Sequence, residues 1–250
     1  LEFIRQLSQN QNNAVFAIVR DTTSSPKLTE LAASKQNVHI IQGDLNSFFQ
    51  LREAAKNISS VTGGSLDVLI NNAAYLDDSV ATVQPSQLSD PEHVEQLKDA
   101  IEKSVESNVL GTIHLTNTFL PLIEQGNEKK IIHTSTGLAD TDVILGTEIS
   151  GLVPYSASKA MMNAVVAKYG AELKPRGIHV VALSPGFVDT NPMPQEALDW
   201  MSAMFRKIDL KVNGRISVEE SVRDQLDTIS KLGWDVQGRM ISQHGDRNWF

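Results

Sequence analysis

The sequence predicts an α/β protein built on a doubly wound parallel sheet. Short apolar runs of strand length alternate with segments of helical periodicity along the 250 residues. The apolar runs show little polar alternation, which is typical of strands covered by helices on both faces. No repeat, low-complexity linker or shift in composition interrupts this order. We therefore expect residues 1–250 to form a single Rossmann-like domain.

Helices and strands alternate regularly in the first half of the chain. The run Ala14 to Val19 is apolar throughout, as expected for a buried strand. Ser89, followed by Asp90 and Pro91, is typical of a helix N-terminus, and we expect a long helix from there that is disturbed near Asn108. The expected helices span 1–8, 26–34, 46–58 and 92–123, and the expected strands span 14–19, 38–41 and 66–70.

The second half continues the alternation around one irregular stretch. Residues 137–154 have no clear period and are expected to form an irregular loop. The expected strands span 130–134, 178–183 and 240–241, and the expected helices span 155–174, 194–205 and 218–232.

Composition excludes several classes of function. The apolar fraction of 41% is ordinary for a globular protein, and the net charge of −8 argues against nucleic acid or an anionic membrane as partner. The absence of cysteine excludes disulfides and thiolate metal sites. The six histidines show no metal-ligand spacing, and His133 and His179 are expected in the core or at strand edges. We expect a cytoplasmic protein without a metal.

Polar or turn residues follow five of the predicted strands. In doubly wound sheets, ligands bind beyond the carboxyl ends of the strands, so these residues form the candidate site. Five such strand ends are much harder to obtain by chance than a single motif. In chain order they are Arg20, Asp44, Asn71-Asn72-Ala73-Ala74, Ser135 with Thr136, and Pro185 to Thr190.

Tyr155 and Lys159 begin the helix that leads into the fifth of these strands. Residues four apart on a helix share one face, so the phenol and the ammonium should lie side by side. A tyrosine has an ordinary pKa of about 10, and a neighbouring cation favours its phenolate. A phenol tuned in this way can give a proton to a carbonyl oxygen or take one from an alcohol.

The ordered set of motifs resembles the short-chain dehydrogenase/reductase (SDR) family over essentially the whole chain. The end of the chain, at 228–233 and Trp249-Phe250, is most similar to the carbonyl-reductase branch that includes sniffer- and C-factor-like proteins. The motifs that carry the family resemblance are Asp44, Asn71-Asn72-Ala73-Ala74, Asn108, Ser135, Tyr155-x-x-x-Lys159 and Pro185-Gly186.

The resemblance implies a role for each catalytic candidate. Tyr155 would be the general acid and base, and Lys159 would hold the nicotinamide ribose and lower the pKa of Tyr155. Asn108 would hold a water in a proton relay. A hydroxyl after the strand 130–134 would orient the substrate carbonyl. Ser135 is preferred for this by residue type, and a second register places Thr136 there.

The resemblance also implies a nicotinamide dinucleotide as cofactor. Arginine after the first visible strand suits a 2′-phosphate, so Arg20 favours NADP(H) over NAD(H), although Asp21 follows it. Asp44 would accept a hydrogen bond from the adenine. Ala74 replaces the glycine that is usual in the family's Asn-Asn-Ala-Gly motif. The remaining cofactor-binding candidates are Asn72, Ala73, Tyr155, Lys159, Val188 and Thr190.

One part of the family pattern is missing. The family begins with a strand and a Thr-Gly-x-x-x-Gly-x-Gly turn that cradles the pyrophosphate, whereas residues 1–7 already resemble the helix that follows that turn. We therefore expect an N-terminal truncation of roughly 15 to 20 residues. The strands at Val15 and Val68 would then lack the neighbour that they share.

These observations predict an NADP(H)-dependent oxidoreductase. It would reduce a ketone or aldehyde, or oxidise the alcohol. The resemblance implies a substrate lid at about 191–215, and Trp200, Met201, Met204 and Phe205 in it suggest a hydrophobic small-molecule substrate. The segment 137–154 is longer than in most family members and would form either part of a substrate wall or a surface insertion without a role. The alternative is a non-catalytic nucleotide sensor or degenerate SDR paralogue that lacks the Gly-rich turn. The resemblance also implies a homodimer through the helices at 92–123 and 155–174, which is compatible with catalysis.

Overall fold

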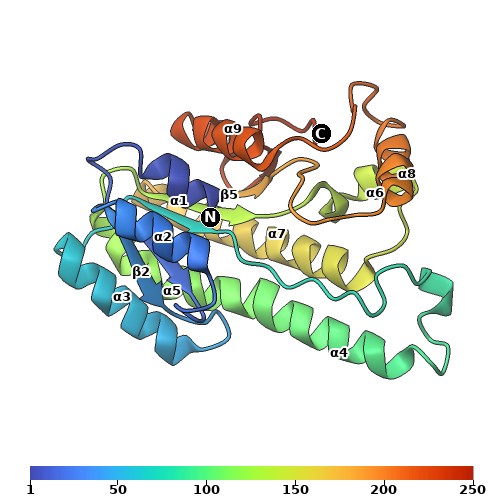
Figure 1. The fold of residues 1–250 in the computed structure, drawn as a ribbon, viewed down its shortest axis with the longest axis horizontal. Coiled ribbons are helices and arrows are strands. Elements are labelled where there is room, and N and C mark those ends of the chain that lie inside the picture. The colour runs from blue at the N-terminus through green and yellow to red at the C-terminus, as the bar shows by residue number, and fades with distance from the viewer. Residues whose placement is uncertain (250) are drawn as a thin grey trace.

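The computed structural model describes residues 1–249 and shows helices packed on both faces of parallel strands (Figure 1). Four strands form one sheet in the order β3-β4-β5-β6, and β1 pairs with β2 in a second sheet. All the pairs are parallel. The strands are β1 (Val15–Val19), β2 (Val38–Gln42), β3 (Val68–Asn71), β4 (Lys130–Thr134), β5 (His179–Ser184) and β6 (Met240–Ser242).

The helices of the first half connect successive strands. They are α1 (Glu2–Leu7), α2 (Pro26–Ser34), α3 (Phe48–Thr62), α4 (Val94–Val105) and α5 (Gly111–Gln125). A 3-10 turn, η1 (Pro85–Gln87), precedes α4, and a π-helical turn, η2 (Glu106–Leu110), joins α4 to α5.

The helices of the second half include the longest of the described chain. They are α6 (Thr141–Thr147), α7 (Val153–Leu173), α8 (Gln195–Phe205) and α9 (Val218–Ser230). Short 3-10 turns lie at η3 (Gly137–Ala139), η4 (Lys174–Arg176) and η5 (Trp234–Val236).

Two hydrophobic layers hold the helices to the larger sheet. On one face, α3, α5 and α7 pack on the strands through residues such as Leu51, Phe119 and Val166, all of them fully buried. On the other face, Ile229 of α9 packs against Ile132 and Val181. This two-sided burial explains why the strands are apolar without alternation. The predicted doubly wound α/β fold is confirmed.

The separation of the two sheets matches the expectation from the sequence. Within residues 1–249, no strand pairs with the free edge of β1 or with that of β3. These are the edges for which the sequence analysis expected a missing shared neighbour.

Two predicted local structures were wrong. The helix expected from Ser89 begins only at Val94, because the preceding residues form η1 and a series of tight turns. The stretch 137–154 is not an irregular loop but contains η3 and α6. Asp140 begins α6 by accepting a hydrogen bond from the Asp142 backbone N–H at 2.9 Å.

No helix within residues 1–249 is both long enough and apolar enough to cross a membrane.

Candidate active site

The C-terminal ends of β3, β4 and β5 lie side by side, at the same end of the larger sheet. The register pairs Asn71 with His133 and His133 with Ala182, so the segments that follow the three strands emerge side by side. Helix α7 begins at the same end, because Lys159 in its second turn reaches the end of β4. The predicted residues Asn71, Ser135, Tyr155 and Lys159 are therefore brought to one region of the molecule.

The ammonium group of Lys159 is the most deeply buried charge of this region. Its side chain is 1% exposed, and Nζ donates a hydrogen bond to the Thr134 carbonyl oxygen at 2.7 Å. Burial lowers the pKa of Lys159 to about 8. An ammonium carries three N–H donors; the Thr134 carbonyl takes one, and Met162 Sδ accepts a second at 3.9 Å. Lys159 is thus anchored to β4 and keeps one donor for a further polar group.

Tyr155 lies one helical turn before Lys159 and is partly exposed. Burial raises the pKa of Tyr155 to about 12, so the phenol remains protonated in the protein alone. The resemblance had implied that Lys159 lowers this pKa. In the protein alone the effect of burial on the pKa of Tyr155 prevails instead, and the Lys159 ammonium is directed to the Thr134 carbonyl.

Asn108 joins the loop after β3 to α7. It lies in η2, where the sequence analysis expected a disturbed helix, and its side chain is almost completely buried. Its Oδ1 accepts from the Tyr75 backbone N–H at 2.8 Å, and its Nδ2 donates to the Tyr75 carbonyl oxygen at 2.9 Å. The same Nδ2 donates to Ser158 Oγ at 2.9 Å. The amide therefore fixes both segments relative to each other.

Ser135 and Thr136 differ in their surroundings. The Ser135 side chain is 2% exposed, and its hydroxyl donates to Asn163 Oδ1 at 2.8 Å and contacts Met240 Sδ at 3.4 Å. Thr136 is partly exposed, and its Oγ1 accepts from the Leu138 backbone N–H at 3.3 Å, which leaves its own O–H to donate. The geometry favours Thr136 over Ser135 as the hydroxyl that is free to bind a ligand.

The predicted residues for the adenosine half follow β1, β2 and β3. The Arg20 side chain is exposed, and Asn72 and Ala73 are exposed as well. Asp44 is partly buried and accepts from the Asn46 backbone N–H at 3.0 Å, which shapes the turn after β2. Arg20 and Asp44 follow the C-terminal ends of the paired strands β1 and β2, so they lie at the same end of the smaller sheet.

The turn after β5 is held by the C-terminal elements. Gly186 has a φ of +86°, and a side chain there would meet Gln243 Nε2 at 2.8 Å, so both conformation and space require glycine. Val188 pairs with Ile216, and the Thr190 backbone N–H donates to the Val188 carbonyl at 3.0 Å. The two ends of the segment 191–215 therefore lie close together, next to the pairing of Val188 with Ile216.

An apolar cluster lies between α8 and the stretch that contains α6. Phe205 and the partly buried Met201 and Met204 of α8 pack with Val143 and Trp249. Lys207 and Glu148 form an ion pair at 2.5 Å across the same contact. The sequence analysis singled out the α8 residues but missed α6, for which Asp140 as a helix cap was the available signal.

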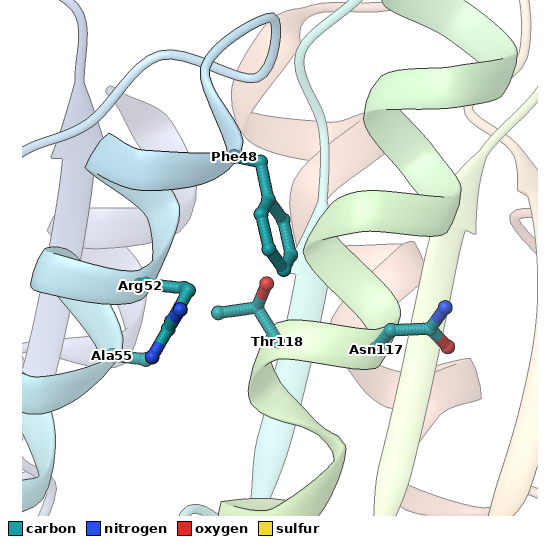
Figure 2. A pocket seen from close by; sticks show the side chains of 5 residues that line it. All are labelled: Phe48, Arg52, Ala55, Asn117 and Thr118. Carbon is teal, nitrogen blue, oxygen red and sulfur yellow. The ribbon is translucent and has the colours of Figure 1, made fainter.

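The cavity shown in Figure 2 lies elsewhere. It has a volume of about 290 Å³ between α3 and α5 and is lined by Phe48, Arg52, Ala55, Asn117 and Thr118. None of the predicted site residues lines it. The candidate active site is therefore the end of the sheet with Tyr155 and Lys159, identified by its chemistry and not by this cavity.

Comparison with known proteins identifies the family. The family model described as short chain dehydrogenase matches residues 1–201. The short-chain dehydrogenase/reductase atnB of Arthrinium sp. is 39% identical over 99% of this chain and 94% of its own length. The short chain dehydrogenase virK of Hypocrea virens is 34% identical with the same coverage of both chains.

Solved structures share the fold at lower identity. The carbonyl reductase from chicken fatty liver superposes with a TM-score of 0.79 at 22% identity, covering 98% of this chain and 92% of its own. Carbonyl reductase Sniffer of D. melanogaster gives a TM-score of 0.76 at 24% identity with the same coverage. With the family model and the fungal relatives, these findings show that the chain belongs to the short-chain dehydrogenase/reductase family of oxidoreductases.

Proposed function

We propose that the protein is an NADP(H)-dependent oxidoreductase that reduces a ketone or aldehyde, or oxidises the corresponding alcohol. The observation that carries this proposal is the pair at the start of α7. A protonated phenol lies one turn from a buried ammonium that is anchored to β4, at the end where doubly wound sheets bind ligands. A sensor without catalysis would not need a proton donor at this place.

The residues at this end of the sheet fit a nicotinamide dinucleotide. The buried Lys159 ammonium has one N–H donor left for a ribose hydroxyl, and the strand-end residues Asn72 and Ala73 are exposed. Within residues 1–249, Arg20 forms no ion pair, so its guanidinium is available for a 2′-phosphate. Val188 and Thr190 would contact the nicotinamide end.

Fold relatives support the choice of NADP(H). The chicken carbonyl reductase is described as NADPH-bound, and a gluconate 5-dehydrogenase from Burkholderia cenocepacia with 18% identity is described in complex with NADP. These descriptions concern those proteins, and we carry the preference to this chain because Arg20 follows β1.

The side chains of the site divide the proton chemistry. When bound, the nicotinamide supplies a hydride in one direction and accepts one in the other. Tyr155 gives its phenolic proton to the substrate oxygen during reduction and takes it back during oxidation. The Thr136 hydroxyl donates a hydrogen bond to the same oxygen, which stabilises the charge that develops there. Asn108 would hold the water of a proton relay, as the family resemblance implies.

The surroundings of the site favour an apolar substrate. The cluster of α8 with Val143 and Trp249 borders the segment after β5, and we propose that 191–215 acts as a lid over the substrate. Trp200 of α8 is half exposed, which leaves an indole at the surface of this lid. We further propose a homodimer through α4, α5 and α7, whose exposed apolar residues include Ile101 and Met161.

Replacing Tyr155 by Phe tests the proposed acid. The variant is expected to lose turnover by roughly a hundredfold or more, because no other group can give the proton at that position. Dinucleotide binding should remain, since the phenolic O–H alone is removed. The measurement is NADPH oxidation with an aromatic ketone by the full-length protein, together with an NADPH binding titration.

Tyr169→Phe is the matched control for Tyr155→Phe. Tyr169 lies on the same helix, and its phenol donates to Asn117 Oδ1 at 2.8 Å, away from the strand ends. Its removal should leave turnover nearly unchanged. Turnover that survives in Tyr155→Phe at the level of this control would reject the proposed mechanism.

Separate variants distinguish the two candidate hydroxyls. Thr136→Val should lower kcat by roughly 10- to 100-fold, because it removes one hydrogen bond to the reacting oxygen. Ser135→Ala should leave kcat nearly intact but lower the free energy of unfolding by about 1 kcal/mol, because it leaves the partly buried Asn163 oxygen without its donor. Kinetics and urea unfolding of both variants decide, and the reverse pattern would restore Ser135 as the ligand-binding hydroxyl.

Arg20→Ala tests the cofactor preference. Loss of a charge-assisted hydrogen bond to a phosphate should weaken NADPH binding by roughly 10- to 100-fold and change NADH binding little. Arg52→Ala, an exposed arginine of α3, serves as the control for net charge. Equal effects of Arg20→Ala on the two dinucleotides would contradict the assignment.

A further inference from the structure

His133 is a fully buried imidazole that the proposed chemistry does not use. It lies in β4, pairs with Asn71 of β3 in the sheet register, and is 0% exposed. Burial, and secondarily the charge of Lys159, lowers the pKa of His133 to about 3. The sequence analysis treated His133 as an ordinary core residue. Its contacts show that it belongs to a polar network under the active site.

The contacts of Asn71 determine the state of the imidazole. Asn71 Nδ2 lies 2.8 Å from Thr112 Oγ1 and 3.4 Å from His133 Nδ1. The Thr112 hydroxyl donates to the Asn108 carbonyl, so its oxygen is the acceptor for one amide N–H of Asn71. The second amide N–H of Asn71 faces His133 Nδ1, which is the acceptor in this arrangement. His133 is neutral because its pKa is lowered to about 3, and with Nδ1 as acceptor its proton lies on Nε2, which is buried and has no hydrogen-bond partner within residues 1–249.

The network continues from Thr112 to the catalytic helix. The Thr112 hydroxyl donates to the Asn108 backbone carbonyl at 2.9 Å. The Asn108 side chain binds both backbone groups of Tyr75 and also Ser158 Oγ. Ser158 Oγ in turn donates to the Tyr155 carbonyl oxygen at 2.8 Å. The hydrogen bonds thus run from β4 through β3 and α5 to η2 and on to α7, and the backbone carbonyl and side-chain amide of Asn108 join the two halves of the series.

We propose that His133 is a positioning residue: its imidazole orients the Asn71 amide, which through Thr112 fixes Asn108 and the two segments that Asn108 joins. Asn108 would then present its carbonyl in one orientation while it holds the start of α7. The role of His133 in turnover rests on the proposed reductase function, whereas its effect on the position of Tyr75 does not.

An apolar residue in place of His133 would disturb the Asn71 amide. A hydrocarbon in place of His133 would leave a buried Asn71 N–H without an acceptor, which costs about 1–3 kcal/mol. The amide would turn to find another partner and would lose its bond to Thr112. An asparagine at 133 would keep the interaction, because its Oδ1 occupies nearly the same place relative to the backbone as the imidazole Nδ1.

Two disruptive variants and one rescue variant test the network. His133→Leu removes the acceptor, Thr112→Val removes the hydroxyl that connects Asn71 to Asn108, and His133→Asn restores an acceptor. The control for Thr112 is Thr116→Val, because Thr116 is also buried in α5 and donates to the carbonyl four residues earlier, at 2.8 Å. The control for His133 is His179→Asn, a partly buried histidine of β5 that stacks on Trp234.

Hydrogen exchange of the Tyr75 amide gives a readout that does not require turnover. This N–H donates to Asn108 Oδ1, so its exchange reports the position of Asn108. His133→Leu and Thr112→Val should accelerate it roughly tenfold, the effect of about one hydrogen bond. His133→Asn, Thr116→Val and His179→Asn should match the unmodified protein.

Steady-state kinetics provide the second readout. In His133→Leu and Thr112→Val, kcat should fall roughly tenfold with little change of KM for the dinucleotide, because proton transfer is misaligned while binding contacts remain. His133→Asn should recover kcat. Unchanged Tyr75 exchange in both disruptive variants, or a His133→Asn variant as impaired as His133→Leu, would overturn the proposal. If the unmodified protein has no turnover, the proposed function fails, and the exchange experiment alone decides the role of His133.

Discussion

The anchoring of Lys159 to β4 is the interaction on which the candidate site depends. A buried ammonium is tolerated only where a polar group receives it, and the Thr134 carbonyl does so at 2.7 Å. That carbonyl is available because Thr134 lies at the last residue of β4, where helix α7 begins alongside. The bond therefore ties the catalytic helix to the sheet and places Tyr155, one turn earlier, at the strand ends.

The π-helical turn η2 supplies the second constraint. The extra residue in the π-helical turn changes the direction of the Asn108 side chain from that in a regular α-helix. Its amide accepts from the backbone N–H of Tyr75 and donates to the backbone carbonyl of the same residue. Ser107, next to it, donates to Asn46 Oδ1 in the turn after β2 at 3.1 Å. The short segment η2 therefore contacts the turn after β2, the loop after β3 and the start of α7, and its orientation determines how these three are placed.

Local patterns predicted the framework, and long-range contacts determined the rest. Buried strands and the spacing of Tyr155 and Lys159 follow from periodicity and can be found in sequence alone. The environment of Ser135 cannot, because it depends on Asn163 and Met240, which are 28 and 105 residues away. The polar contacts of His133 likewise depend on Asn71, which is 62 residues distant. For this reason residue type suggested Ser135, whereas packing favours Thr136.

We propose that burial keeps the Tyr155 phenol protonated in the protein alone, and that the positive charge of bound NADP⁺ lowers its pKa. The most direct measurement is an ultraviolet titration of the phenol in the full-length protein, as the difference between wild type and Tyr155→Phe, without and with NADP⁺. Tyr155 should remain protonated at pH 10 in the protein alone, in accord with a pKa of about 12, and should ionise below pH 10 when NADP⁺ is bound. A phenol that stays protonated at pH 10 in both states would contradict the account.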